Sequence, residues 1–126
     1  MLINTCDYSD NASAITLLWE NPSPTTTFAA QTINLDLSGY EMMYVLHMAA
    51  TDYQYLSITP LINDPDIGEQ HIMSYAGTTI SERGASVTDS GIVFTSGTYI
   101  KSSSSGTLSN GTGTGYAIPY RIYGRR

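Results

Sequence analysis

Short strand-forming segments separated by glycine occupy the chain from residue 70 to residue 101. They are rich in Ile, Val, Thr and Tyr, which favour pleated strands, and they end at Gly or Ser-Gly steps of the kind that turns contain. Short spacing with glycine turns is typical of antiparallel hairpins. We therefore expect strands at Gln70–Tyr75, Thr78–Arg83, Ser86–Asp89, Ile92–Thr95 and Thr98–Lys101, with turns at Gly77, Gly84, Ser90-Gly91 and Ser96-Gly97.

The segment 14–20 carries the alternation of a half-buried strand. Ile15, Leu17 and Trp19 fall on one face of this strand, and the sequence Asn-Pro-Ser-Pro at 21–24 ends it. We expect that face to point inward and Trp19 to anchor the core.

Three more segments complete the first half of the chain. Residues 31–37 alternate strictly, and residues 53–59 form a further strand, whereas residues 60–68 are rich in Asn, Asp and Pro and predict a surface loop. In the segment 31–37 the apolar residues expected to point inward are Ile33, Leu35 and Leu37.

The run Met42–Ala50 fits either a helix or a strand. Its apolar residues also recur at helical spacing, and Met, Leu and Ala are good helix formers. The run has no capping box, however, and its surroundings are rich in strand formers. We predict a central strand covered on both faces, as continuous apolar runs favour.

The chain ends in a strand signal. The β-formers from Tyr116 to Tyr123 are broken once by Pro119, which cannot donate to a ladder and so belongs on a sheet edge or at a bulge. Residues 102–115 are of low complexity with a single apolar side chain, Leu108. We expect a long mobile hairpin loop there, with a binding tip as the alternative.

Composition supports one all-β domain over residues 1–126. The chain holds 11 Gly and 10 Tyr, Ser and Thr are abundant, and its 13.7 kDa is enough to bury a core. We predict a single antiparallel β-sandwich, jelly-roll-like, of about eight to ten short strands.

Charge and cysteine content exclude several classes. A net charge of −6 argues against nucleic acid and anionic membranes, which need concentrated Lys and Arg. Cys6 is the single cysteine and rules out an internal disulfide, so we expect a free, at least partly buried thiol. No basic segment followed by an apolar one opens the sequence, and no apolar run reaches membrane-spanning length, so we expect neither a secretory leader nor a membrane span. We expect the chain to be made in the cytoplasm.

The sequence contains few residues in catalytic patterns. His47 and His71 lie in no zinc spacing, and His47 is expected to be a hydrogen-bonded structural residue inside an apolar run. No Gly-x-Ser-x-Gly elbow or phosphate-binding loop is present. The carboxylates of Asp64, Asp66 and Glu69 suit Ca²⁺, but turn formation explains them better. We expect no enzyme activity, no cofactor and no metal.

The tyrosines are the remaining candidates for binding. The candidates for stacking against sugar rings are Tyr53, Tyr55 and Tyr99, and Tyr75 is a fourth. Tyr53 and Tyr55 share one strand face. Tyrosine is equally common at subunit interfaces and core margins, and we favour those roles over sugar binding.

Several phrases of the sequence together resemble small tail-associated or minor structural proteins of tailed bacteriophages, including receptor-binding and fibre-tip domains. The phrases are Leu18-Trp-Glu-Asn-Pro-Ser-Pro24, Phe28-Ala-Ala-Gln-Thr-Ile33, Leu35-Asp-Leu-Ser-Gly-Tyr40, Ser90-Gly-Ile-Val-Phe-Thr-Ser-Gly97 and Ile118-Pro-Tyr-Arg-Ile-Tyr-Gly124. The resemblance spans nearly the whole chain and carries over no binding residue.

The resemblance implies a virion structural protein at the tail or its fibres, made in the bacterial cytoplasm and assembled as a homotrimer with other virion proteins. One alternative is a capsid decoration or head-fibre protein. Another is a carbohydrate-binding module that recognises host surface glycan. A glycan depolymerase is the last, because it needs two facing carboxylates that no spacing indicates.

Overall fold

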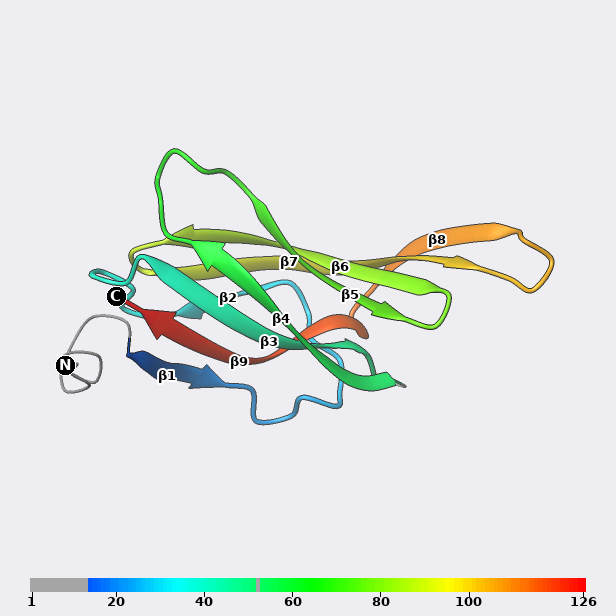
Figure 1. Cartoon of the computed structure of the whole chain (residues 1–126), viewed down its shortest axis with the longest axis horizontal. Helices are drawn as coiled ribbons and strands as arrows, with labels where there is room; N and C mark the ends of the chain where they lie inside the picture. The colour runs from blue at the N-terminus through cyan, green and yellow to red at the C-terminus, as the bar shows by residue number, and fades with distance from the viewer. Residues whose placement is uncertain (1–13, 52) are drawn as a thin grey trace, which may run out of the picture.

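The computed structural model describes residues 14–51 and 53–126, and within them the side chains of Tyr53, Gln54 and Tyr55 are not described. The described part is built from strands joined by turns and loops (Figure 1). The strands are β1 (Ile15–Glu20), β2 (Gln31–Asn34), β3 (Met42–Ala50), β4 (Tyr53–Ile62), β5 (Gln70–Ala76), β6 (Thr79–Thr88), β7 (Gly91–Ser102), β8 (Leu108–Gly113) and β9 (Tyr116–Arg125).

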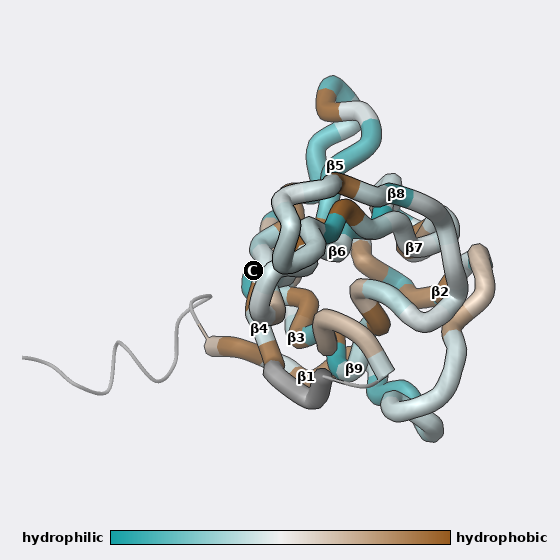
Figure 2. Tube along the Cα trace, turned by 90° about the vertical axis from the view of Figure 1, so that its right-hand side faces the viewer, coloured by the Kyte–Doolittle hydropathy of each residue, from teal (hydrophilic) through white to brown (hydrophobic). Residues whose placement is uncertain are grey.

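Two antiparallel sheets pack face to face. Sheet A has the order β1-β9-β3-β4, and sheet B has the order β2-β7-β6-β5, with β8 paired to the second half of β7. The view along the sandwich shows both sheets around a common interior (Figure 2). The predicted all-β antiparallel sandwich is confirmed, and β3 is a strand, not a helix.

The core lies between the sheets and is apolar and aromatic. Phe28, in the connection between β1 and β2, packs edge-on against Phe94 of β7 with ring centroids 5.8 Å apart. Trp19 packs edge-on against Phe28 from the other side, at 6.2 Å. Edge-to-face aromatic pairs add stability beyond the area they bury. The inward direction expected for Ile33, Leu35 and Leu37 is confirmed, since all three lie in or against the core.

A β-bulge in β1 overturns the expected inward face of that strand. The register with β9 shifts between Leu17 and Trp19, so these two residues no longer point to the same side. Trp19 packs against the core as expected, whereas Ile15 and Leu17 are 59% and 49% exposed. Strict alternation predicted that Ile15, Leu17 and Trp19 share the inner face. The extra residue of the bulge turns Ile15 and Leu17 to the outer face.

The C-terminal strand lies inside a sheet. β9 pairs with β1 on one side and with β3 on the other. Pro119 occupies the irregularity where the register with β3 shifts between Leu46 and His47. Of the two places expected for this proline, the structure shows the bulge, which removes the need for a donor at that position. β3 is also not covered on both faces throughout, because Tyr44 and Leu46 are only half-buried on its outer side.

Two of the expected turns lie inside long strands. β6 runs through Gly84 and β7 runs through Ser96-Gly97, so four predicted strands are two. A Cβ at Gly97 would meet the Tyr116 carbonyl oxygen and, at 2.8 Å, that of Gly113. Glycine at this position therefore permits close approach of two backbones, which a single sequence cannot distinguish from a turn.

Residues 102–115 are not the long loop that their composition predicts. Leu108–Gly113 form β8, which pairs with β7 from Gly97 to Ser102 and projects from the body as a two-stranded arm (Figure 1). Backbone hydrogen bonds to β7 stabilise β8, although β8 has few apolar side chains. The predicted loop 60–68 is likewise shorter, because β4 continues through Pro60 to Ile62.

We expect Gly97→Ala to lower the free energy of unfolding by about 1–3 kcal/mol, because the added methyl group must displace the backbone at the start of β9. Gly77→Ala is not a suitable control, since Gly77 has a positive φ of 59°. Gly68→Ala is suitable, because a Cβ there meets nothing within 4 Å. Urea unfolding followed by Trp19 fluorescence measures both variants. Equal midpoints would contradict the close-approach explanation.

Candidate functional site

The outer face of sheet A is apolar across all four strands. Pairing registers align its side chains in rows, such as Leu17, Tyr123, Tyr44 and Pro60 across β1, β9, β3 and β4. The apolar and aromatic side chains on this face, which we call the apolar face, are Ile15, Leu17, Met42, Tyr44, Leu46, Leu56, Ile58, Pro60, Ile62 and Tyr123.

The apolar face is open to solvent. Ile58 is 63% exposed and Leu56 is 49% exposed, although both are large aliphatic residues. A hollow of about 490 Å³ lies near its centre, lined by Ile15, Tyr44, Leu46, Ile58 and Tyr123. Monomeric soluble proteins rarely expose large contiguous apolar patches, and such patches mark interaction sites.

Three charged residues lie among the apolar rows. Arg121 forms an ion pair with Glu20 at 3.2 Å, and its guanidinium stacks 4.6 Å from the Tyr120 ring centroid. Arg125 reaches over Met42, with Nη2 at 3.8 Å from the sulfur. The chain as a whole carries a charge of −6, yet this face holds two arginines and one glutamate.

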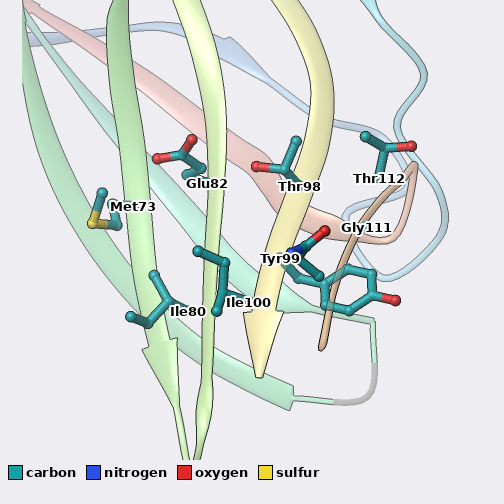
Figure 3. A pocket seen from close by; sticks show the side chains of 9 residues that line it. Met73, Ile80, Glu82, Thr98, Tyr99, Ile100, Gly111 and Thr112 are labelled. Atoms are coloured by element: carbon teal, nitrogen blue, oxygen red, sulfur yellow. The ribbon is translucent and has the colours of Figure 1, made fainter. Parts of the chain in front are cut away.

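A groove of about 450 Å³ crosses the outer face of sheet B (Figure 3). Met73, Ile80 and Ile100 form its apolar part, each from a different strand. Glu82 and Thr98 supply polar groups, and β8 closes one side with Gly111 among its residues. Among the lining residues of this groove Glu82 is the one carboxylate, so the facing pair that a glycosidase requires is not assembled there.

The structure separates the predicted binding tyrosines. Tyr53 and Tyr55 belong to β4 of sheet A, and their side chains lie outside the described residues. Tyr99 belongs to β7 of sheet B, where its ring packs against Tyr116 with centroids 4.5 Å apart and borders the groove. Tyr75 is 67% exposed on β5. Tyr99 therefore shares no sheet with Tyr53 and Tyr55.

His47 is buried and hydrogen-bonded on both ring nitrogens, as expected for a structural histidine. Ser74 Oγ lies 2.7 Å from Nδ1, and Thr59 Oγ1 lies 2.8 Å from Nε2. Burial lowers the pKa of His47 to about 4. Ser74 and His47 have the separation of a nucleophile and its base, but Ser74 is 1% exposed, so no substrate reaches its oxygen.

Arg83 is fully buried between the sheets. Among the described residues, its guanidinium donates hydrogen bonds only to backbone carbonyl groups and lies over one aromatic ring. Nε donates to the Ala117 carbonyl at 2.9 Å, Nη1 to Thr95 at 2.7 Å and Nη2 to Tyr116 at 2.8 Å. The cation also lies 5.1 Å from the Phe28 ring centroid. Burial lowers the pKa of Arg83 to about 10, so it keeps its charge at neutral pH.

The Asp64 carboxylate forms a local turn. Its Oδ1 accepts a hydrogen bond from the Asp66 backbone nitrogen at 2.9 Å. In the described part of the chain, no three His, Cys, Asp or Glu side chains gather as metal ligands do. Cys6 lies outside the described residues. No helix within the described ranges is long and apolar enough to cross a membrane.

The apolar face and the role of Arg83 were not predicted from the sequence. Ile15 and Leu17 were expected to point inward, and Leu56 and Ile58 were not weighed as surface residues. Arg83 offered no signal of its burial, because its sequence neighbours Glu82 and Gly84 do not distinguish it from a surface arginine.

No protein-family model matches the chain, and neither a curated protein nor a solved structure matches it significantly. The comparisons therefore do not link the chain to phage tail proteins, and its function rests on its own residues and on the resemblance of its phrases.

Proposed function

We propose that this chain is a non-enzymatic structural protein of a phage virion, at the tail or its fibres, which assembles with further copies of itself through the apolar face. The exposed apolar face is the observation that carries the self-association. The resemblance of the sequence supports the virion and the homotrimer.

The charges favour a second copy as the occupant of this face. Two acidic chains repel each other on average, but the face combines two arginines with one glutamate, which reduces that repulsion there. Glu20 of one copy is free to turn from its own Arg121 toward an arginine of the next, because exposed ion pairs exchange at little cost.

A closed ring uses both sides of the face. Around a threefold axis, Leu17 on the β1 side of one copy meets Ile58 on the β4 side of the next, and three such contacts close the ring. An arrangement of this kind buries the exposed aliphatic residues of every copy.

Light scattering after size exclusion tests this proposal. We expect a mass three times the 13.7 kDa of the chain. Ile58→Lys places a charge in the contact and is expected to weaken association at least about 30-fold, as loss of an interface hot spot does. Ile100→Lys is the matched control, because Ile100 is 50% exposed on the outer face of sheet B. A monomer at high concentration contradicts the self-association.

The place in the particle has its own test. We expect mass spectrometry to detect the chain in purified tails. Its presence in purified heads instead would favour the capsid decoration or head-fibre alternative.

A further inference from the structure

The two edges of sheet A are the strands β1 and β4 (Figure 1). In an antiparallel ladder, successive residues turn their N–H and C=O groups alternately toward one side of the strand and toward the other. Every second residue of an edge strand therefore presents both groups to the open side. Such an edge is either guarded or used for pairing with a further strand.

β4 is guarded at the end that contains Pro60 and Ile62. The side chain of Gln70 accepts a hydrogen bond from Ile62 N at 2.9 Å and donates one to Ile62 O at 2.8 Å, so both backbone groups of Ile62 face away from β3. The register with β3 is regular from Leu56 to Ile62, and the alternation therefore turns Pro60, Ile58 and Leu56 to the same open side. Pro60 has no N–H group to offer.

The other end of β4 is open at Leu56 and Ile58. Within the described part of the chain, no backbone hydrogen bond reaches the outward groups of these two residues. Their side chains belong to the apolar face and are 49% and 63% exposed. A strand that adds to β4 therefore pairs with Leu56 and Ile58 and not with the guarded end.

The edge of β1 is open at Ile15 and Leu17. The same alternation, followed through β3 and β9, turns Gly124 and its partner Thr16 toward each other, so Ile15 and Leu17 face the open side of β1. Among the described residues, none bonds to their backbone groups on that side. Their side chains also belong to the apolar face, so both open edges border the same surface.

We propose that β1 of one copy adds to β4 of the next as an antiparallel strand, with Ile15 opposite Ile58 and Leu17 opposite Leu56. This pairing rests on the proposed self-association and names the backbone contact that closes it. All four residues then use their outward N–H and C=O groups. The apolar face also continues from one copy to the next, because the side chains of paired residues lie on the same side of a sheet.

The guarded end of β4 selects this register. A shift of β1 by two residues toward Ile62 places Ile15 opposite Pro60, and one hydrogen bond is lost because proline has no N–H. A shift by two residues in the other direction places Leu17 opposite the polar Gln54. The proposed register alone joins four aliphatic residues to four unused pairs of backbone groups.

Strand direction and stagger agree with a closed threefold ring. β1 runs antiparallel to β4 within one copy, and a rotation about an axis along the strands keeps that relation between copies. Leu17 is level with Pro60 of its own copy and opposite Leu56 of the neighbour, a stagger of four residues across four strands. One residue per strand is the stagger of closed barrels whose strands tilt by about 36°.

Amide hydrogen exchange of the full chain tests the pairing, measured once in the dilute monomer and once in the concentrated assembly. We expect the amides of Ile15, Leu17, Leu56 and Ile58 to exchange at least about tenfold more slowly in the assembly. Thr59 is the internal control, because its amide faces β3 in both states. An oligomer with unchanged exchange at the four residues would overturn the strand pairing alone, whereas a monomer at every concentration would overturn the self-association with it.

Disulfide cross-linking tests the register, in a chain whose native cysteine is removed by Cys6→Ser. Paired residues of antiparallel strands have Cα atoms about 5.5 Å apart, within the range of a disulfide. We therefore expect Leu17→Cys with Leu56→Cys to form covalent dimers and trimers under mild oxidation. Leu17→Cys with Ile62→Cys is the matched control and is expected to stay monomeric, because six residues along a strand span about 20 Å. Equal linking in both pairs, or none in either, would overturn the register.

Discussion

Replacing Arg83 with alanine is expected to lower the free energy of unfolding by about 3–5 kcal/mol, the loss typical when a buried charged network is broken. The substitution leaves the carbonyl groups of Thr95, Tyr116 and Ala117 without the donors that now reach them. It also opens a cavity beside Phe28, because the whole arginine side chain is enclosed.

The three hydrogen bonds hold an unusual piece of backbone. Ala117 has a φ of 48°, in the left-handed region that residues other than glycine avoid. Such a conformation persists where surrounding contacts determine it, and two of the three Arg83 bonds are to this residue and to Tyr116 before it. Arg83 therefore joins β6 to the first two residues of β9 and links the two sheets.

Urea unfolding at pH 7, followed by Trp19 fluorescence, measures the loss. Arg83→Met is the informative comparison, because it keeps much of the volume and removes the buried charge, and we expect it to lose less than Arg83→Ala. Arg121→Ala is the surface control, with an expected loss of about 0–1 kcal/mol. A loss for Arg83→Ala no larger than that of the surface control would contradict the role assigned to Arg83.

Acidification is expected to destabilise the protein through His47. The pKa of this residue is about 4 in the folded state and 6.5 in an unfolded chain. Between these values the unfolded chain binds the proton and the folded chain does not, so lowering the pH favours unfolding. As far as His47 is concerned, the free energy of unfolding keeps its full value above pH 6.5 and falls by about 3 kcal/mol as the pH reaches 4.

Urea midpoints measured from pH 7 to pH 4 show this slope. His47→Gln keeps an amide near Ser74 and Thr59 but does not titrate, so its stability is expected to vary less with pH over this range. His71→Gln removes the exposed histidine and is expected to retain the slope of the native chain. The same slope in His47→Gln would place the acid sensitivity on the carboxylates instead.

Local pattern predicted most of the strands in this protein. β3 and β5 lie where alternation and apolar runs predicted them, because strand propensity and side-chain alternation are local properties of the sequence. The structural interpretation of His47 also followed from sequence, since a polar residue inside an apolar run has to be buried with partners.

Local pattern was wrong at Gly84 and Gly97, where it predicted turns inside strands. A turn and a close backbone approach both select glycine, and the difference depends on a strand far away in sequence, such as β9 opposite Gly97. The same holds for β8, whose order comes from pairing with β7 and not from its own side chains.

The candidate interaction surface was decided by tertiary structure as well. The amino-acid sequence by itself determined that the chain is all-β, that it is acidic, and which residues are apolar. Whether Ile15 and Leu17 point to the core or to solvent depends on one extra residue in the pairing of β1 with β9. Because side chains alternate with a period of two, a single bulge exchanges the inner and outer faces of a strand. The assembled sandwich alone therefore decided which apolar residues form the core and which form the exposed apolar face.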